Sequence, residues 1–420
     1  MFESVLLAAT AFVGARVLPV EGAPIERGVL VIDGAKIVAV GPEGSTSIPA
    51  GARRVDLSGK TLIPGLVDTH SHVGGVAGAD GSAPIQPDVS VGDSVNPFDP
   101  GFRRVVAGGI TTMNVMPGSG HLLSGKTVYL KPKPAKTLDA MQIRDGAGNA
   151  LGGLKMANGT NSQRENPPFP GTRGKSAALV REKFVAAQEY RDKLARAKGD
   201  PEKAPARDLG LETLVEVLDG KRVVHHHTHR ADDILTVLRL QKEFGFKVVL
   251  QHVSEAWKVT DEIKASGAGC SAILVDSPGG KLETRDLNLA TGRILEQAGI
   301  LTAWHTDDWI TDSRLFLRMG AIGVRYGMTR EGSLAALTLN GAKLLDLDAR
   351  VGSLKAGKDA DFVVLSGDPF SSKTEVLETW IEGEKVFDRS VPDDRLHAEG
   401  GYGAGNPMKP YLCCADEVAQ

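Results

Sequence analysis

The chain has 420 residues and a formal net charge of −3, with 41% hydrophobic and 24% charged residues. This length accommodates one large domain and a smaller one, and the composition is that of a soluble globular protein. The small net charge argues against nucleic acid or an anionic membrane surface as a partner, and no segment is long and apolar enough to span a bilayer. Only three cysteines occur, which fits a reducing compartment, so we expect a cytoplasmic protein.

The N-terminal run MFESVLLAATAFVGAR has the apolar core of a signal peptide but lacks its basic start. Glu3 precedes the apolar run and the first basic residue is Arg16, so we expect a first β-strand here instead. The following GVLVIDGAKIVAVG predicts a hairpin, because two apolar runs meet at Asp33–Gly34, a dipeptide that favours a tight turn.

From TLIPGLVDTH onward, buried-strand patterns alternate with helical ones. Apolar residues at helical spacing, ended by glycine, predict helices at 231–245 and 256–267. Further strands are expected at 110–118, 150–159, 222–230, 247–254, 269–277 and 301–309. This alternation over most of the chain predicts an α/β fold, a parallel sheet closed into a (β/α)8 barrel of the TIM type.

Strand patterns return after residue 348, where DADFVVLSGDP and EVLETWIEGEKVFD predict a second hairpin, with its turn near Glu382–Gly383. Two β-rich ends predict one small β-sandwich domain assembled from residues 1–58 and 348–390, around a barrel at 59–347. An insertion at 160–205 combines a polar loop with a charged helix, and residues 391–420 read as a tail.

Side chains of the types that bind metals or move protons stand at the carboxyl ends of five expected barrel strands. Barrel enzymes build their sites at these ends, and residues two apart in a strand, such as His70 and His72, face the same side. Each residue alone is as compatible with barrel packing as with chemistry, so the argument rests on their convergence. The candidates are His70, His72, Lys155, His227, His252 and Asp307.

The run RVVHHHTHR at 222–230 divides by the alternation of a strand. His225, His227 and His229 share the inward face, whereas His226 points outward to the helices. These three inward-facing histidines differ in how deep they lie in the barrel. We expect His225 to pack low in the barrel, His227 to reach the site and His229 to face the substrate.

As a set, these motifs resemble the metal-dependent amidohydrolase superfamily, close to its imidazolonepropionase-like and lysine-bearing dipeptidase-like branches. The resemblance covers nearly the whole chain. It rests on the split β-domain and on PGLVDTHSH, GLKMANG, HHHTHRADDI, LQHVSEA, HTDD and GSLKAGKDADFVVLSGDP. Together the motifs are specific for the superfamily and say little about the substrate.

The resemblance implies a divalent metal, expected to be Zn²⁺, with one or two ions per chain. His70 and His72 would bind the more buried ion, and His227 and His252 the second. Lys155 would bridge both ions as a carbamate formed with CO₂, which turns a costly buried ammonium into an anionic ligand.

The implied reaction is hydrolysis of an amide- or peptide-type C–N bond by a metal-activated hydroxide, with Asp307 as a metal ligand and catalytic proton shuttle. The alternative is a mononuclear deaminase, or a hydrolase of cyclic C–N bonds like imidazolonepropionase, with Lys155 unmodified. Metal content measured with and without bicarbonate separates these readings. A non-catalytic scaffold would have lost ligand positions, and all of them are filled here.

The expected substrate is a small molecule or short peptide, such as a dipeptide, an N-acyl amino acid or a lactam. His229 and Arg230 are candidates to bind its carboxylate, and His121, in the loop PGSGHLLSGKT, is a third candidate contact. His305 is expected to support the ligands from below, and Asp308 replaces Asp307 if the strand register differs by one. A homo-oligomer is expected from base rates alone.

Overall fold

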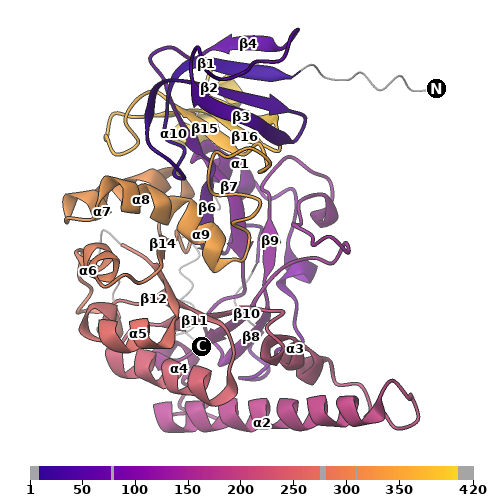
Figure 1. The fold of residues 1–420 in the computed structure, drawn as a ribbon. Helices are drawn as coiled ribbons and strands as arrows, with labels where there is room; N and C mark the ends of the chain where they lie inside the picture. The colour runs from indigo at the N-terminus through magenta and orange to yellow at the C-terminus, as the bar shows by residue number, and fades with distance from the viewer. Residues whose placement is uncertain (1–8, 77–79, 275–280, 309, 405–420) are drawn as a thin grey trace.

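The structure of the protein, a computed structural model, describes residues 9–76, 80–274, 281–308 and 310–404. The first eight residues of the N-terminal apolar run, the expected strand ends at 275–277 and 309, and Cys413 and Cys414 lie outside the described residues. Helices and strands are mixed along the chain, as an α/β class predicts (Figure 1). In the described part, no helix combines the length and hydrophobicity that crossing a membrane requires.

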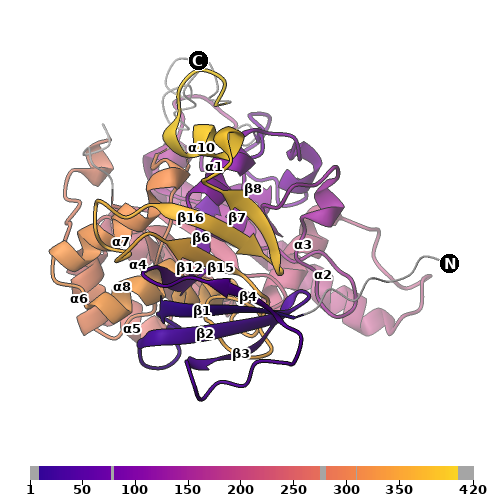
Figure 2. The ribbon, with the colours of Figure 1, turned by 90° about the horizontal axis from the view of Figure 1, so that it is seen from above.

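One eight-stranded sheet joins the two ends of the chain, and Figure 2 shows its N-terminal strands (indigo) beside its C-terminal ones (yellow). Its order is β17-β16-β15-β5-β1-β2-β3, with β4 paired to β1. The strands are β1 (Thr10–Val17), β2 (Ile25–Asp33), β3 (Lys36–Pro42), β4 (Arg53–Asp56), β5 (Thr61–Pro64), β15 (Phe362–Leu365), β16 (Val376–Ile381) and β17 (Glu384–Asp388). β5 carries this sheet beyond residue 58.

Aromatic side chains from both ends of the chain form the core of this sheet. The rings of Phe12 and Phe362 meet edge to face at 4.9 Å, and those of Phe362 and Trp380 stack at 5.4 Å. All three are buried. Because β1 supplies the first ring and β15 and β16 the other two, neither end of the chain can complete this core alone.

This sheet contains two hairpins, and the turn predicted from the sequence agrees with the structure in only one of them. In the first, Asp33 pairs with Lys36, so the two-residue loop is Gly34–Ala35, one position beyond the expected Asp33–Gly34. In the second, Ile381 pairs with Glu384, which confirms Glu382–Gly383 as the loop. Both of those residues have positive φ, 50° and 79°, as a tight hairpin turn that matches the strand twist requires.

Two further sheets contain the strands that carry the candidate residues. The six-stranded one has the order β14-β13-β12-β11-β10-β8, and the three-stranded one the order β6-β7-β9. Their strands are β6 (Leu66–Ser71), β7 (Ile110–Val115), β8 (Leu123–Lys126), β9 (Val128–Leu130), β10 (Leu154–Ala157), β11 (Val224–Thr228), β12 (Val248–His252), β13 (Gly269–Ala272) and β14 (Thr302–Trp304).

Backbone pairings link these two sheets into a ring. Only Thr127 separates β8 from β9; β8 pairs antiparallel with β10, and β9 pairs antiparallel with β7. On the other side, a parallel bridge joins Ser71 to Asp308, and the backbone N–H of Asp307 donates to the carbonyl of His70 at 2.9 Å. The ring is therefore parallel except between β7 and β10, where one bent strand runs the opposite way.

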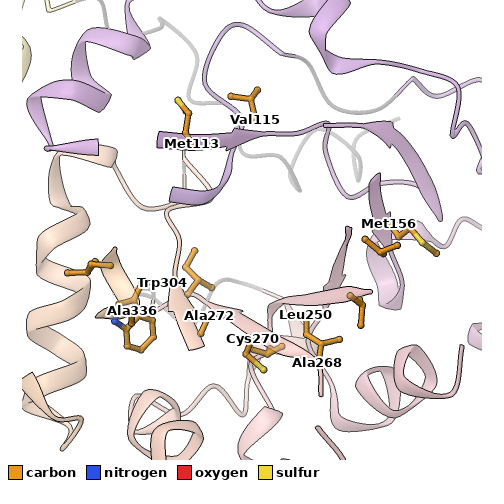
Figure 3. Packing of buried hydrophobic residues seen from close by; sticks show 14 of the residues in the cluster. Met113, Val115, Met156, Leu250, Ala268, Cys270, Ala272, Trp304 and Ala336 are labelled. Atoms are coloured by element: carbon orange, nitrogen blue, oxygen red, sulfur yellow. The ribbon is translucent and has the colours of Figure 1, made fainter. Parts of the chain in front are cut away.

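Side chains on the ring strands alternate between two environments. One set joins the main hydrophobic core and includes Met156, Leu250 and Cys270, three of the side chains drawn in Figure 3. The residues next to these, Lys155, Gln251 and Ser271, are polar and fully buried on the opposite face. Burial on both faces explains why these strands read as nearly continuous buried runs in the sequence.

Helices surround the ring and cover its apolar side (Figure 1). They are α1 (Gly101–Ala107), α2 (Arg173–Ala197), α3 (Leu209–Leu218), α4 (Ala231–Phe244), α5 (Thr260–Ser266), α6 (Thr291–Gln297), α7 (Phe316–Arg325), α8 (Arg330–Leu337), α9 (Leu339–Leu344) and α10 (Pro392–Glu399). α2 is the charged helix expected in the insertion. α10 lies within the expected tail and packs against α1, where Arg103 pairs with Asp393 and Asp394.

Candidate active site

The structure brings most of the candidate residues together at the carboxyl ends of the ring strands. His70 is on β6, Lys155 on β10, His227 on β11 and His252 at the end of β12. His72 follows β6, and Asp307 lies three residues beyond β14. All six side chains are buried, which is unusual for lysine and aspartate unless they are paired or bind an ion.

The tightest group is formed by His70, His72 and Asp307. The Nε2 atoms of the two histidines lie 3.3 Å apart, and each faces Asp307 Oδ1, at 3.3 Å from His70 and 3.0 Å from His72. Lys155 Nζ lies 3.1 Å from His70 Nε2 and 3.1 Å from the sulfur of Met116. Two imidazole nitrogens and a carboxylate oxygen thus converge on one point.

Backbone geometry at His252 and Asp307 is strained. Their φ angles are +68° and +48°, in the left-handed region that residues other than glycine rarely occupy. Asp68 on β6 holds the second of these positions, because its carboxylate accepts hydrogen bonds from the backbone N–H and the hydroxyl of Thr306, at 3.0 and 2.5 Å. Such strain, about 1–3 kcal/mol per residue, is typical of residues that a functional site holds in place.

A second group consists of His227, His229 and Glu283, whose potential ligand atoms lie within 4.8 Å of one another. Both ring nitrogens of His227 lack a hydrogen bond to the described residues, and so does Oε1 of Glu283. Sequence reasoning missed Glu283, because it lies in the three-residue 3-10 helix Leu282–Thr284 between β13 and α6, which no strand pattern or motif marks.

The four clustered histidines lie at different depths. His225 Nε2 contacts the hydroxyl of Tyr129 at 3.0 Å, and its Nδ1 accepts from the Gln251 amide at 3.2 Å, so its ring is held below the site. His227 and His229 are next to each other and next to His252, with ring centroids 4.4 to 5.1 Å apart. His225 is thus held by Tyr129 and Gln251, apart from the group that His227 and His229 form with His252.

A series of buried hydrogen-bond contacts through Ser271 and His305 supports His252. Nδ1 of His305 contacts Ser271 Oγ at 2.6 Å, and its Nε2 lies 3.1 Å from Nδ1 of His252. His252 Nε2 makes no hydrogen bond to the described residues. Asp308 points away from the histidines and accepts hydrogen bonds from the backbone and hydroxyl of Ser313. The register thus turns Asp307, not Asp308, toward the site.

Burial controls the protonation of the cluster. It lowers the pKa of His70, His227 and His252 well below the ordinary value, so these imidazoles are neutral and keep a lone pair. Burial by itself raises the pKa of Asp307, but the hydrogen bond with His72 and the electrostatic effect of the surrounding basic side chains, Lys155 among them, outweigh it and hold the pKa below its usual range. Neutral imidazoles around an ionised carboxylate are the donor set that a divalent cation such as Zn²⁺ binds. The buried atoms without hydrogen bonds on His227 and His252 fit the same interpretation.

The three substrate candidates have different surroundings. His229 is buried beside His227, with Nδ1 bonded to Ser254 Oγ at 2.9 Å. His121 is buried and packs edge to face on Phe169 of the insertion, with ring centroids 5.2 Å apart. Arg230 is not brought into the cluster: its side chain is 42% exposed and forms a two-pronged ion pair with Asp232 in the first turn of α4.

Comparison with solved structures decides the family. The chain superposes on an amidohydrolase from Thermotoga maritima MSB8 with a TM-score of 0.84 and 34% sequence identity, over 90% of this chain and 100% of that one. The chain belongs to the amidohydrolase family. Its residues 200–387 also match the sequence family of that name.

Two curated relatives are similar to this amidohydrolase over most of its length. Amidohydrolase tasK of Hapsidospora irregularis is 26% identical over 403 residues, which cover 89% of this chain but only 40% of that protein. Imidazolonepropionase of Erwinia tasmaniensis is 25% identical and is aligned over 81% of this chain and 86% of its own. The family is one of hydrolases that act on C–N bonds.

Proposed function

We propose that this amidohydrolase is a metal-dependent enzyme that hydrolyses an amide- or peptide-type C–N bond in a small peptide, an N-acyl amino acid or a lactam. The observation that carries the proposal is the buried convergence of His70 Nε2, His72 Nε2 and Asp307 Oδ1 within 3.3 Å of one another. We also propose that the ring of strands is a TIM-type barrel and the terminal sheet a β-sandwich domain. The continuous pairings around the ring and the joint aromatic core of the terminal sheet support this.

His70, His72 and Asp307 would hold the metal, for which we propose Zn²⁺. When bound, such an ion polarises a carbonyl oxygen and lowers the pKa of a coordinated water toward roughly 7. Asp307 would take the proton of the attacking water and deliver it to the departing nitrogen. Its Oδ1 faces His70 and His72, so Oδ2, which lies 3.7 Å from His252 Nδ1, is the oxygen that would carry the proton. His252, supported by His305, would keep that carboxylate oriented.

Lys155 would carry a CO₂-derived carbamate if two ions share the site. Its Nζ is fully buried next to a neutral imidazole and a thioether, where an ammonium is poorly solvated. Intact-mass measurement of the protein, with and without bicarbonate, tests this directly.

A substrate panel tests the proposed reaction. Metal-loaded protein would be incubated with dipeptides, N-acyl amino acids, lactams and aminated heterocycles, and the products identified by mass spectrometry. The proposal predicts a new carboxylate together with a released or ring-opened amine. Ammonia released from a heterocycle, with no amide cleaved, would favour a deaminase and contradict the proposal.

A further inference from the structure

A cavity of about 530 Å³ lies outside the candidate active site, between helix α7 and the C-terminal part of the terminal sheet. Its walls come from α7, from the 3-10 helix Ser313–Leu315 before it, from the loop at 366–375 between β15 and β16, and from the ends of α1 and α10. None of the candidate metal or substrate residues is among the described residues that line it. Its volume suits a small molecule, since ligand pockets typically enclose about 300–1,000 Å³.

Arginine side chains surround this cavity. Arg318 and Arg325 are seven residues apart on α7, about two turns, so both stand on the face of the helix that lines the cavity. Arg314 and Arg389 line other walls. Among the described residues that line the cavity, Glu375 alone carries a carboxylate. The lining therefore has an excess of positive charge.

Two of the arginines are held in place by carboxylates. Asp312 accepts hydrogen bonds from Nε and Nη2 of Arg314, and Glu375 accepts one from Arg389 at 2.8 Å. The side chains of these two arginines are only about one fifth exposed. Arg325, in contrast, is exposed and forms no ion pair within the part of the chain that the structure describes. The paired arginines thus shape the walls, and the charge of Arg325 is available to an anion.

An apolar surface lies between the arginines. Leu317 and Ile322 of α7 line the cavity on one side, and Phe370 and Val376 line it on the other. Ala321, also on α7, leaves space between them because its side chain is a single methyl group. A ligand that matches this lining needs an apolar or aromatic body as well as a negative charge.

Phe370 is fixed before any ligand arrives. The guanidinium of Arg330 lies 4.9 Å from the centroid of its ring, and its backbone N–H donates to Asp368 Oδ1 at 2.8 Å. Its ring edge also packs against Gly320 of α7, where a Cβ atom would lie 3.0 Å from the ring. A wall that is already in position lowers the entropic cost of binding.

We propose that this cavity binds a small organic anion, in which an apolar or aromatic body carries a phosphate, sulfonate or carboxylate group. Guanidinium groups recognise such oxyanions because their N–H groups match pairs of oxygen atoms. The charged group would lie at Arg318 and Arg325, and the apolar body would contact Phe370 and Ile322. The site does not depend on the proposed hydrolysis.

Two fluorescent probes that differ in charge test this site. Anilinonaphthalene sulfonate combines an aromatic body with a permanent negative charge, and phenylnaphthylamine has the same ring system without the charge. Full-length protein would be titrated with each probe. We expect one saturable site for the anionic probe, with an affinity that falls as salt is added. The uncharged probe should bind at least about 10-fold more weakly, because it lacks the charge-assisted contacts.

Two substitutions locate the binding. Arg325→Glu reverses a charge of the lining and should weaken binding of the anionic probe at least about 10-fold. Ala321→Phe fills the space on α7 and should weaken binding of both probes. The matched controls are Ala321→Ser, which keeps a small side chain, and Arg196→Glu, which makes the same charge change on the exposed surface of α2. Both controls should bind the anionic probe within about twofold of the unchanged protein.

The proposal is overturned if the unchanged protein has no saturable site for the anionic probe, or if the two probes bind equally well. Unchanged binding in both Arg325→Glu and Ala321→Phe would also overturn it, because the probe would then lie elsewhere. An equal loss in Arg196→Glu would show unspecific attraction by charge and contradict a built site. The melting temperature of each variant shows whether it has folded. Because no outcome depends on metal or turnover, failure of the proposed hydrolysis is seen separately, in the substrate panel.

Discussion

Gln251 determines which nitrogen of His70 is available to the site. Its side-chain oxygen lies 3.2 Å from His70 Nδ1, and its amide nitrogen 3.2 Å from His225 Nδ1. Because an amide has one donor end and one acceptor end, His70 must carry its proton on Nδ1, and its Nε2 lone pair then faces His72 and Asp307. His225, the histidine of the run that lies lowest, thus acts on the site through Gln251.

We expect Gln251→Met to weaken Zn²⁺ affinity by about 10- to 100-fold, because His70 loses the partner that fixes its tautomer. Gln251→Glu keeps the acceptor for His70 and should restore affinity to within a few-fold of the unchanged protein. Competition with a chromogenic chelator measures both. Equal losses in the two variants would show that Gln251 matters only for packing.

At the scale of single residues, the sequence predicted what strand alternation controls. His70, His72, Lys155, His227 and His252 lie at strand ends, where position along the strand decides which way a side chain points. Glu283 could not be predicted, because a 3-10 helix of only three residues has no recognisable periodicity and its position depends on tertiary contacts. Arg230 was expected near the substrate, but Asp232, two residues later, offers it a closer partner at the surface.

Among the elements, the bent strand β8–β9 is what local patterns could not predict. β8 and β9 have four and three residues, so no hydrophobic period can be recognised, and their antiparallel direction follows from pairing with β7 and β10. The long strand–helix units, in contrast, were placed to within a few residues. After β9, Lys131 extends to the terminal sheet and pairs with Asp359 and Asp361 at 3.0 and 2.5 Å, all three being buried.

We expect Lys131→Met to lower the free energy of unfolding by about 3–5 kcal/mol, because it leaves the buried Asp361 carboxylate without its cation. Asp359 keeps Lys36 at 2.7 Å and Arg350 at 3.0 Å. The control is Lys133→Met. Lys133, two residues after Lys131, pairs with Glu382, but both of these side chains are about one quarter exposed. Loss of this ion pair should therefore cost about 1 kcal/mol or less. Urea unfolding followed by circular dichroism measures both. Similar shifts in the two variants would contradict a special role for the buried cluster.

For the whole molecule, the ends of the chain are tied together by charge as well as by the aromatic core. Glu21, after β1, accepts hydrogen bonds from Ser353, from Lys355 at 3.1 Å and from Lys358 at 2.9 Å, all shortly before β15. The hydrogen bond from Ser353, together with the two lysines, lowers the pKa of Glu21 to about 2, although partial burial acts in the opposite direction. The sequence predicted that the two ends share a domain, but not this connection, because the partners are more than 300 residues apart.

The contribution of Glu21 to stability should depend on pH in a defined window. Its pKa is lower in the folded protein, so the contribution is fully present above the ordinary value of 4.5 and is lost as the pH falls toward about 2. Glu21→Gln should therefore be less stable than the unchanged protein near neutral pH, and the difference should shrink below pH ~4. Urea midpoints of both proteins across this range check it. A difference that is constant with pH would contradict the ion-pair explanation.

If the buried group around Asp307 performs metal-dependent hydrolysis, both the metal and the carboxylate must be needed for turnover, and one kinetic comparison measures both. On the best substrate of the panel, hydrolysis rates would be measured for the metal-loaded protein, the chelator-treated protein, and a metal-loaded Asp307→Asn variant with verified metal content. We predict that chelation abolishes turnover, that added Zn²⁺ restores it, and that Asp307→Asn lowers kcat by about 10²- to 10⁴-fold. Turnover that survives metal removal, or that Asp307→Asn leaves unchanged, would contradict the claim.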